Sequence, residues 1–408
     1  MEAKLSGLLV EENKEVRKRK TNMVNYDLVF MFVFIALLLV LYVRNRKNIQ
    51  FQGLMALYRT KLGINFSKKA AGRFPRFFRY FGYLSIILGF VGMIIISYVL
   101  VTGGINLLTK PNAQPVVAPV LPFVHIPGLP TLLFTYWIIG IFVVAVIHEL
   151  SHAFLSSLYG VKVKSSGFAF LGPIPAAFVE PDEKQLAKKK KPEQLAVLAA
   201  GSTSNIVTGL VFLIVLLFIL TPAVLSVSTF DIRITEVVNN TPADFAGLGK
   251  GMLIKEIGGM PAENISRIFE TLKPNQKLNI ITDKGNFNLV TAENPENKTK
   301  GYIGISIEVE AKPKSENSKT SFAILIWVQR LFLWLFVLSL GIALVNLLPL
   351  GPIDGGRMFH VVLGYITEDE KKKNFIFKSV TLISLFFIIL NLSPYIIRFF
   401  NWLIGLGA

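Results

Sequence analysis

The sequence has no cysteine, so disulfide bonds and thiolate ligands are excluded, and any metal site must use histidine, aspartate, glutamate or water. Histidine is scarce as well, with four residues in the chain. The 26 acidic residues are outnumbered by 43 Lys and Arg, which gives a formal net charge of +17. In a soluble protein this excess would suggest nucleic acid, but 52% of the residues are hydrophobic, and basic cytosolic loops are the commoner cause in membrane proteins. We therefore expect a polytopic membrane protein with no nucleic-acid partner.

Six apolar stretches are long enough to span a bilayer as helices. The predicted spans cover residues 26–43, 81–101, 131 to about 160, 194–220, 322–348 and 375–392. The first span follows a long charged tail and lacks a small-residue cleavage site, which argues against a removable signal peptide. The fold class is therefore mainly α, with about six transmembrane helices and a small α/β domain outside the membrane.

The sequence divides into seven segments. A charged tail comes first, followed by two accessory spans, two core spans, an extramembrane domain, a polar linker, a third core span and a C-terminal span with its tail. These segments are residues 1–24, 25–129, 130–221, 228–310, 311–320, 321–365 and 366–408.

Loop charges predict the orientation in the membrane. The loops after the first, third and fifth spans hold ten, seven and four Lys or Arg, whereas the loop after the second span holds one, Lys110. By the positive-inside rule the basic loops are cytosolic, and the insert at 222–320 faces outward. The N-terminal tail, with six basic residues, opposes this orientation, but three concordant loops outweigh one tail.

The third span carries the motif His148-Glu149-Leu150-Ser151-His152. On a helix, histidines four residues apart lie on one face, where both imidazoles can bind one zinc ion. Glu149 can then act as general base toward a water at the open coordination position. Ionisable side chains are costly within a bilayer and indicate function there. The other two histidines, His125 in a proline-rich loop and His360 after a glycine turn, are interpreted as structural.

Two histidines need a third protein ligand if zinc is to keep one open position. Asp354 follows the fifth span, which runs in the same direction as the third, so it is predicted at the same membrane depth, near the cytosolic side. Considered alone, Asp354 could equally belong to a helix-end turn with Gly355 and Gly356 as caps. With two histidines at that depth, ligation is favoured. The fourth span adds Asn205 about two turns from the same face.

Together these motifs resemble the site-2 protease family of intramembrane zinc metalloproteases. The resemblance covers about residues 130–365 and depends on the histidine motif, a Gly-x-x-x-Asn element, and an Asn-x-x-Pro element before Asp-Gly-Gly. It implies that His148, His152 and Asp354 hold zinc, with Glu149 as base. It also implies that Asn205 and Asn346 hold the substrate backbone or the developing oxyanion. A departure is Ser202, where the family usually has proline.

Two further segments bear on function. Residues 167–180 are apolar but rich in Gly and Pro, and the resemblance suggests a strand-like segment that dips into the membrane and pairs with an extended substrate. A loop packed on neighbouring helices is an equal alternative. The outer insert resembles a PDZ domain, with expected strands at 232–237 and 278–281 and a peptide-terminus loop at 301–305.

The sequence therefore predicts a multi-pass membrane enzyme, a zinc endopeptidase that cleaves transmembrane segments of protein substrates within the lipid. Its PDZ-like domain is expected on the outer face. One alternative is a membrane scaffold or chaperone that binds peptides through the PDZ-like domain, but scaffolding needs no base at Glu149. A metal transporter is less favoured, because transporters place polar residues along several spans.

Overall fold

The computed structural model of the protein describes residues 14–45, 49–52, 55–61, 63–111, 113–124, 126, 128–171, 174–262, 265–295 and 297–405. His125, the first part of the charged tail and the pair 172–173 lie outside the described residues. The chain forms two compact units. One is made by residues 24–126, 130–216 and 330–408, and the other is centred on residues 217–329.

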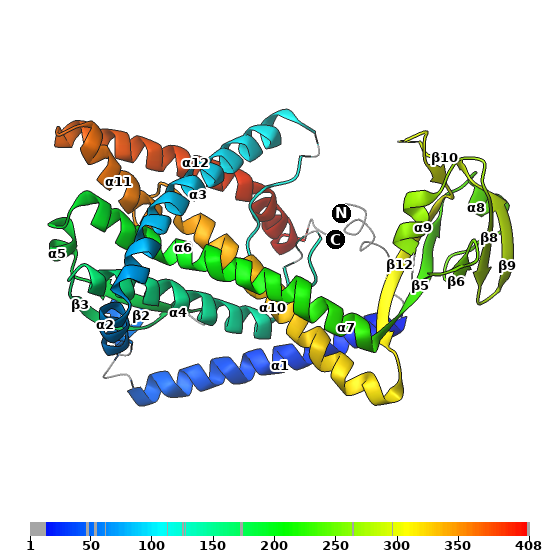
Figure 1. Ribbon diagram of the computed structural model, residues 1–408, viewed down its shortest axis with the longest axis horizontal. Helices are drawn as coiled ribbons and strands as arrows, with labels where there is room; N and C mark the ends of the chain where they lie inside the picture. The colour runs from blue at the N-terminus through cyan, green and yellow to red at the C-terminus, as the bar shows by residue number, and fades with distance from the viewer. Residues whose placement is uncertain are drawn as a thin grey trace. The chain divides into compact units, whose positions relative to one another are not determined.

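Six helices in the described part of the chain are long and apolar enough to cross a membrane, which confirms the predicted number of spans and the mainly α fold. The fourth span continues beyond α6 through a π-helical turn, Leu216–Leu220, into α7 (Thr221–Val227). The spanning helices are α1 (Lys14–Asn45), α3 (Pro75–Thr109), α4 (Phe134–Leu158), α6 (Lys191–Val215), α10 (Lys319–Asn346) and α12 (Glu370–Leu403) (Figure 1).

Helix α6 is the centre of the larger unit. It packs against α3 on one side and α4 on the other, and it also contacts the short helix α11 (Asp354–Ile366) (Figure 1). Small side chains allow helices to approach closely within a bilayer, where packing rather than hydrophobic burial drives association. The buried face of α6 is rich in such residues: Ala196, Ala199, Ala200, Gly201, Ser202 and Ser204.

A four-stranded antiparallel sheet lies beside α4 in the same unit. Its order is β1-β2-β3-β4, so β4 is an edge strand, and β4 packs along α4. Residues 167–171 and 174–180 of the apolar segment therefore form strands, as the resemblance predicts, and not the loop of the alternative, although β4 does pack on a helix. The strands are β1 (Ile49–Gln52), β2 (Met55–Thr60), β3 (Val163–Leu171) and β4 (Ile174–Pro181).

The first two strands lie within the basic segment between the first two spans, which is predicted from its sequence to be a loop. The short helices α2 (Ile64–Arg73) and α5 (Glu183–Ala187) complete this region. Arg59 of β2 donates to Glu180 of β4 and to Ser165 of β3, at 2.9 Å for the latter. The hydrogen bond from Ser165 and the guanidinium of Arg59 hold the pKa of Glu180 below its usual range. Strand β2 is thus joined to β3 and β4 by side-chain contacts as well as by the backbone hydrogen bonds of the sheet.

The smaller unit is built on an antiparallel sheet of order β12-β5-β6-β8-β9, with β7 paired to β6. Ile232 and Ile234 alternate with Arg233 along β5 and are buried, as the period of a strand requires. The strands expected at 232–237 and 278–281 lie in β5 and β8. The elements are β5 (Ser228–Val237), α8 (Pro242–Phe245), β6 (Leu253–Ile257), β7 (Met260–Pro261), α9 (Ile265–Thr271), β8 (Lys277–Thr282), β9 (Gly285–Val290), β10 (Ala292–Glu293), β11 (Gly301–Tyr302) and β12 (Ile305–Pro313).

Candidate metal centre

Helix α4 supplies two histidines to the candidate metal centre. His148 and His152 lie one helical turn apart, and both are buried, with exposed fractions of 7% and 8%. Their Nε2 atoms are 3.2 Å apart, so the two imidazoles converge on one point although their rings are inclined by 72°. The helix continues without interruption to Leu158, which fixes both backbones on a rigid element.

Asp354 is the first residue of α11, and it reaches the histidines because the chain turns sharply after α10. Gly355 and Gly356 make this turn possible. A Cβ on Gly355 would lie 2.3 Å from the carbonyl oxygen of Leu347, and one on Gly356 would lie 1.8 Å from that of Leu350. Residues with side chains cannot occupy these positions, so the glycines allow α11 to begin directly against the end of α10. They lie inside the first turn of α11 rather than capping a helix end.

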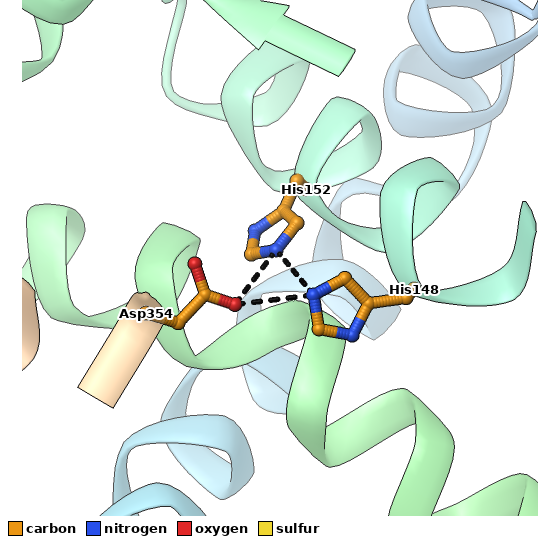
Figure 2. A group of neighbouring side chains, drawn as sticks. All are labelled: His148, His152 and Asp354. Carbon is orange, nitrogen blue, oxygen red and sulfur yellow. Dashed lines mark hydrogen bonds and ion pairs between the residues drawn. The ribbon is translucent and has the colours of Figure 1, made fainter. Parts of the chain in front are cut away.

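The three side chains meet at one carboxylate oxygen, as Figure 2 shows. Oδ2 of Asp354 lies 3.1 Å from Nε2 of His148 and 3.1 Å from Nε2 of His152. Burial alone would raise the pKa of Asp354, but the two imidazoles outweigh burial and lower it below the usual range. Asp354 is thus placed to offer one carboxylate oxygen as a ligand beside the two imidazoles.

The donor set fits zinc. Among the described residues this is the one group of three or more His, Asp or Glu whose ligand atoms could hold a metal ion. Ligands at about 2.0–2.2 Å around a tetrahedral ion are separated by about 3.3–3.6 Å. The three ligand atoms lie 3.1–3.2 Å apart, within a few tenths of an ångström of that spacing. Two imidazoles and one carboxylate also match the composition of catalytic zinc sites, which keep a fourth position open.

Helix α6 gives the imidazoles room. A Cβ on Gly201 would lie 2.5 Å from Nε2 of both His148 and His152, so glycine is required where α6 passes the histidines. One turn earlier, the carbonyl oxygen of Val197 lies 2.7 Å from Nδ1 of His152. A carbonyl only accepts, so Nδ1 of His152 carries the proton and Nε2 keeps a lone pair for a metal.

Glu149 lies next to the first histidine but contacts the sheet. Its Oε2 accepts a hydrogen bond of 2.7 Å from the backbone N–H of Val179, in β4. This contact fixes the carboxylate between α4 and the edge strand. Because Val179 directs its N–H away from β3, the alternate residues Ala177 and Pro175 face the same outer edge.

The two predicted substrate-binding asparagines occupy different environments. Asn205 is fully buried on α6, and its Nδ2 lies 3.2 Å from Nδ1 of His148. Asn346 is the last residue of α10 and is half-buried, at the start of the turn that leads to Asp354. The structure thus brings Asn205 against a predicted metal ligand, whereas Asn346 lies at the entrance to the turn.

His360 does not join the metal centre. It lies two turns along α11 from Asp354, with its ring centroid 5.3 Å from that of Phe377. Burial, together with the charge of Lys373, lowers the pKa of His360. Its edge-on packing against an aromatic ring agrees with its interpretation as a structural residue.

Sequence reasoning missed three groups that support the site. Two are backbone groups, the carbonyl of Val197 and the N–H of Val179, and no side-chain pattern can indicate these. The third is Asp27 of α1, which accepts hydrogen bonds from the N–H groups of Phe134 and Thr135, the latter at 3.0 Å. Asp27 therefore caps the first turn of α4 from another helix. The sequence did contain a signal for Asp27, because an acidic residue within a membrane span is costly unless it has partners.

Comparison with known proteins gives two findings. The family model described as Peptidase family M50 matches residues 136–391, which include all three predicted metal ligands and Glu149. The chain is also 29% identical over 378 residues to Uncharacterized protein MJ0971 of Methanocaldococcus jannaschii. That alignment covers 88% of this chain and 91% of the relative, so the similarity extends beyond the region that the family model matches.

Proposed function

The chain belongs to peptidase family M50, and on that premise we propose that it is an intramembrane zinc endopeptidase that cleaves transmembrane segments of other proteins. The observation that carries the proposal is the convergence of His148, His152 and Asp354, beside Glu149, with the histidines on a helix able to span the membrane. A membrane-spanning metallopeptidase with its site on such a helix works most directly on substrates within the bilayer.

His148, His152 and Asp354 would hold the zinc. Zinc supplies Lewis acidity there, which lowers the pKa of a bound water to about 7 and polarises the scissile carbonyl. The protein orients its ligands through the carbonyl of Val197 and the close approach of Gly201. Both belong to α6, so the metal site is supported by a second rigid helix.

Glu149 is the proposed general base. It accepts the proton of the attacking water and passes it to the leaving amine. The N–H of Val179 holds one oxygen, Oε2, which leaves the other oxygen of the carboxylate for the water. Because the carboxylate is already oriented, little further entropy is lost in positioning it when the substrate binds.

The outer edge of β4 is the proposed substrate-binding strand. Helical carbonyls are already hydrogen-bonded, so a transmembrane substrate must unwind before water can attack it. Backbone pairing with Ala177 and its neighbours on this edge would hold the unwound segment extended. The same strand contacts Glu149, which supports cleavage close to the paired segment. Asn346 is proposed to bind the substrate backbone or the developing oxyanion.

The protein is an integral membrane protein, and lipid is its surrounding partner. Loop charges support an outer location for the insert at 228–310 and a cytosolic-side active site. The insert is proposed to be PDZ-like, since β12 lies at one end of the strand order among the described residues, and Gly304, before β12, has a φ of +88° that favours glycine. Such an edge could accept a peptide strand.

The decisive test compares wild type with Glu149→Gln in proteoliposomes, after equal zinc content has been measured. The substitution keeps size and shape but removes the base, so cleavage of a transmembrane substrate should fall by about 10²–10⁴-fold. The same target sequence in a water-soluble peptide serves as a second substrate. It should be cleaved much more slowly than the embedded segment.

Three outcomes would contradict the proposal. Equal cleavage rates for wild type and Glu149→Gln would exclude Glu149 as the base. Faster cleavage of the soluble peptide would refute an intramembrane substrate while leaving a metallopeptidase. No cleavage by either protein, with peptide binding retained by the insert in the full chain, would favour the scaffold alternative.

A further inference from the structure

The side of α6 that faces the catalytic helix carries a regular stripe. Val197, Gly201 and Asn205 are each four residues apart, so they lie on one face of the helix. The carbonyl of Val197 contacts Nδ1 of His152, Gly201 leaves room for both rings, and the amide of Asn205 contacts Nδ1 of His148. Each imidazole therefore has one partner on the same helix, two turns apart.

The two partners differ in chemistry. The carbonyl of Val197 can only accept, so it selects the tautomer of His152 in which Nε2 is free for a metal. The amide of Asn205 can donate or accept. With Nδ2 toward His148, as the amide is oriented here, it would donate to Nδ1 and leave the proton of His148 on Nε2. That tautomer presents an N–H, not a lone pair, to the centre of the site.

The opposite amide orientation removes this conflict. Oδ1 of Asn205 is fully buried and has no hydrogen-bond partner among the described residues. The oxygen and nitrogen of an amide have nearly the same shape, so the two orientations occupy the same space. Exchanging them lets Oδ1 accept from Nδ1–H of His148, and Nε2 then carries the lone pair that a metal needs.

We propose that Asn205 is a positioning residue that selects the metal-binding tautomer of His148 through its amide oxygen, and that it does not contact the substrate. This inference rests on the proposed zinc site. It replaces the substrate-binding role predicted for Asn205, because the side chain is fully buried against His148 and offers no surface to a substrate. Val197 and Asn205 then perform the same task for the two histidines.

Zinc affinity measured by competition with a chromogenic chelator, on the purified full chain in detergent, tests the proposal. Asn205→Leu keeps the shape but removes the acceptor, and losing such a partner typically weakens metal binding about 10–100-fold. Asn205→Asp keeps an acceptor and should bind zinc at least as tightly as wild type. Ser202→Ala is the matched control, because Ser202 is fully buried on α6 and its hydroxyl has no hydrogen-bond partner among the described residues. The control should bind like wild type.

Activity with excess zinc separates the two roles. If Asn205 acts through His148, the KM of Asn205→Leu for a transmembrane substrate should match that of wild type. Wild-type zinc affinity with a raised KM would restore the substrate-binding role. Should Asn205→Leu fail to fold, weaker zinc binding by Asn205→Asp than by wild type would still refute the acceptor role. A wild-type chain that binds no zinc would refute the metal site itself, which is a different failure.

Discussion

Replacing Gly201 by alanine should abolish the metal site while preserving the fold. A Cβ at this position would lie 2.5 Å from Nε2 of His148 and 2.5 Å from Nε2 of His152, whereas ordinary contacts are 3.4–4 Å. Each ring would have to retreat by about 0.9 Å to reach ordinary contact. Metal–ligand distances tolerate only about 0.2 Å. The two histidines therefore cannot keep their positions around one ion.

The magnitude follows from this displacement. Removing one hydrogen-bond partner of a metal ligand typically weakens metal binding about 10–100-fold. Moving two ligands by several times the tolerated distance should therefore weaken zinc binding at least about 100-fold. The same substitution should slightly stabilise helix α6 itself, because alanine is favoured over glycine within a helix by about 1 kcal/mol. Loss of zinc and loss of fold are thus separable in this variant.

Gly341→Ala provides the control. Gly341 lies inside α10, and a Cβ there would meet nothing within 4 Å. Zinc content, chelator competition, helix content by circular dichroism and cleavage would be measured for both variants in detergent. Gly341→Ala should behave like wild type, whereas Gly201→Ala should keep its helix content and lose zinc and activity. One tightly bound zinc in Gly201→Ala would refute the geometry of the site.

Two further predictions concern the edge strand and the orientation. Val179→Pro removes the N–H that holds Glu149 and should lower kcat with zinc content unchanged. Ala177→Pro removes an N–H on the same edge that is proposed to pair with the substrate and does not contact Glu149, so it should raise KM and keep a higher kcat. Equal kcat values for the two variants would exclude this role of Val179. In intact cells an impermeant thiol reagent should label an engineered cysteine at Ser315 and not one at Lys189, since loop charges predict opposite sides. The reverse labelling pattern would overturn the orientation.

Local sequence patterns predicted the spans well because each depends on a single apolar segment. The second span was predicted at 81–101, and α3 extends from Pro75 to Thr109. Helix bounds differ at the ends because polar residues continue a helix beyond the hydrocarbon region. The histidine spacing is local as well, so its shared face on α4 followed directly from helix geometry.

Long-range pairing was harder to predict. Asp354 was predicted near the histidines only because the third and fifth spans were predicted to run in the same direction and to end at the same membrane depth. The structure brings the three residues together. The strands at 49–52 and 55–60 were not predicted, because β2 pairs with β3 more than a hundred residues later and its own sequence is short and mixed. The PDZ-like resemblance of the insert and the role of Asn346 stay predictions.

The segments before the matched family region act on the catalytic helix from both ends. Asp27 of α1 caps the N-terminal turn of α4, where unpaired N–H groups would be costly in a bilayer. Helix α2 packs against the other half of α4, with Ser67 and Ser157 hydroxyls 3.3 Å apart. Strand β2 extends the sheet whose edge strand bonds Glu149. The first accessory span, helix α2 and strand β2 therefore help to position the proposed base and metal ligands of α4. The structural support of this site thus begins well before residue 136, where the family match starts.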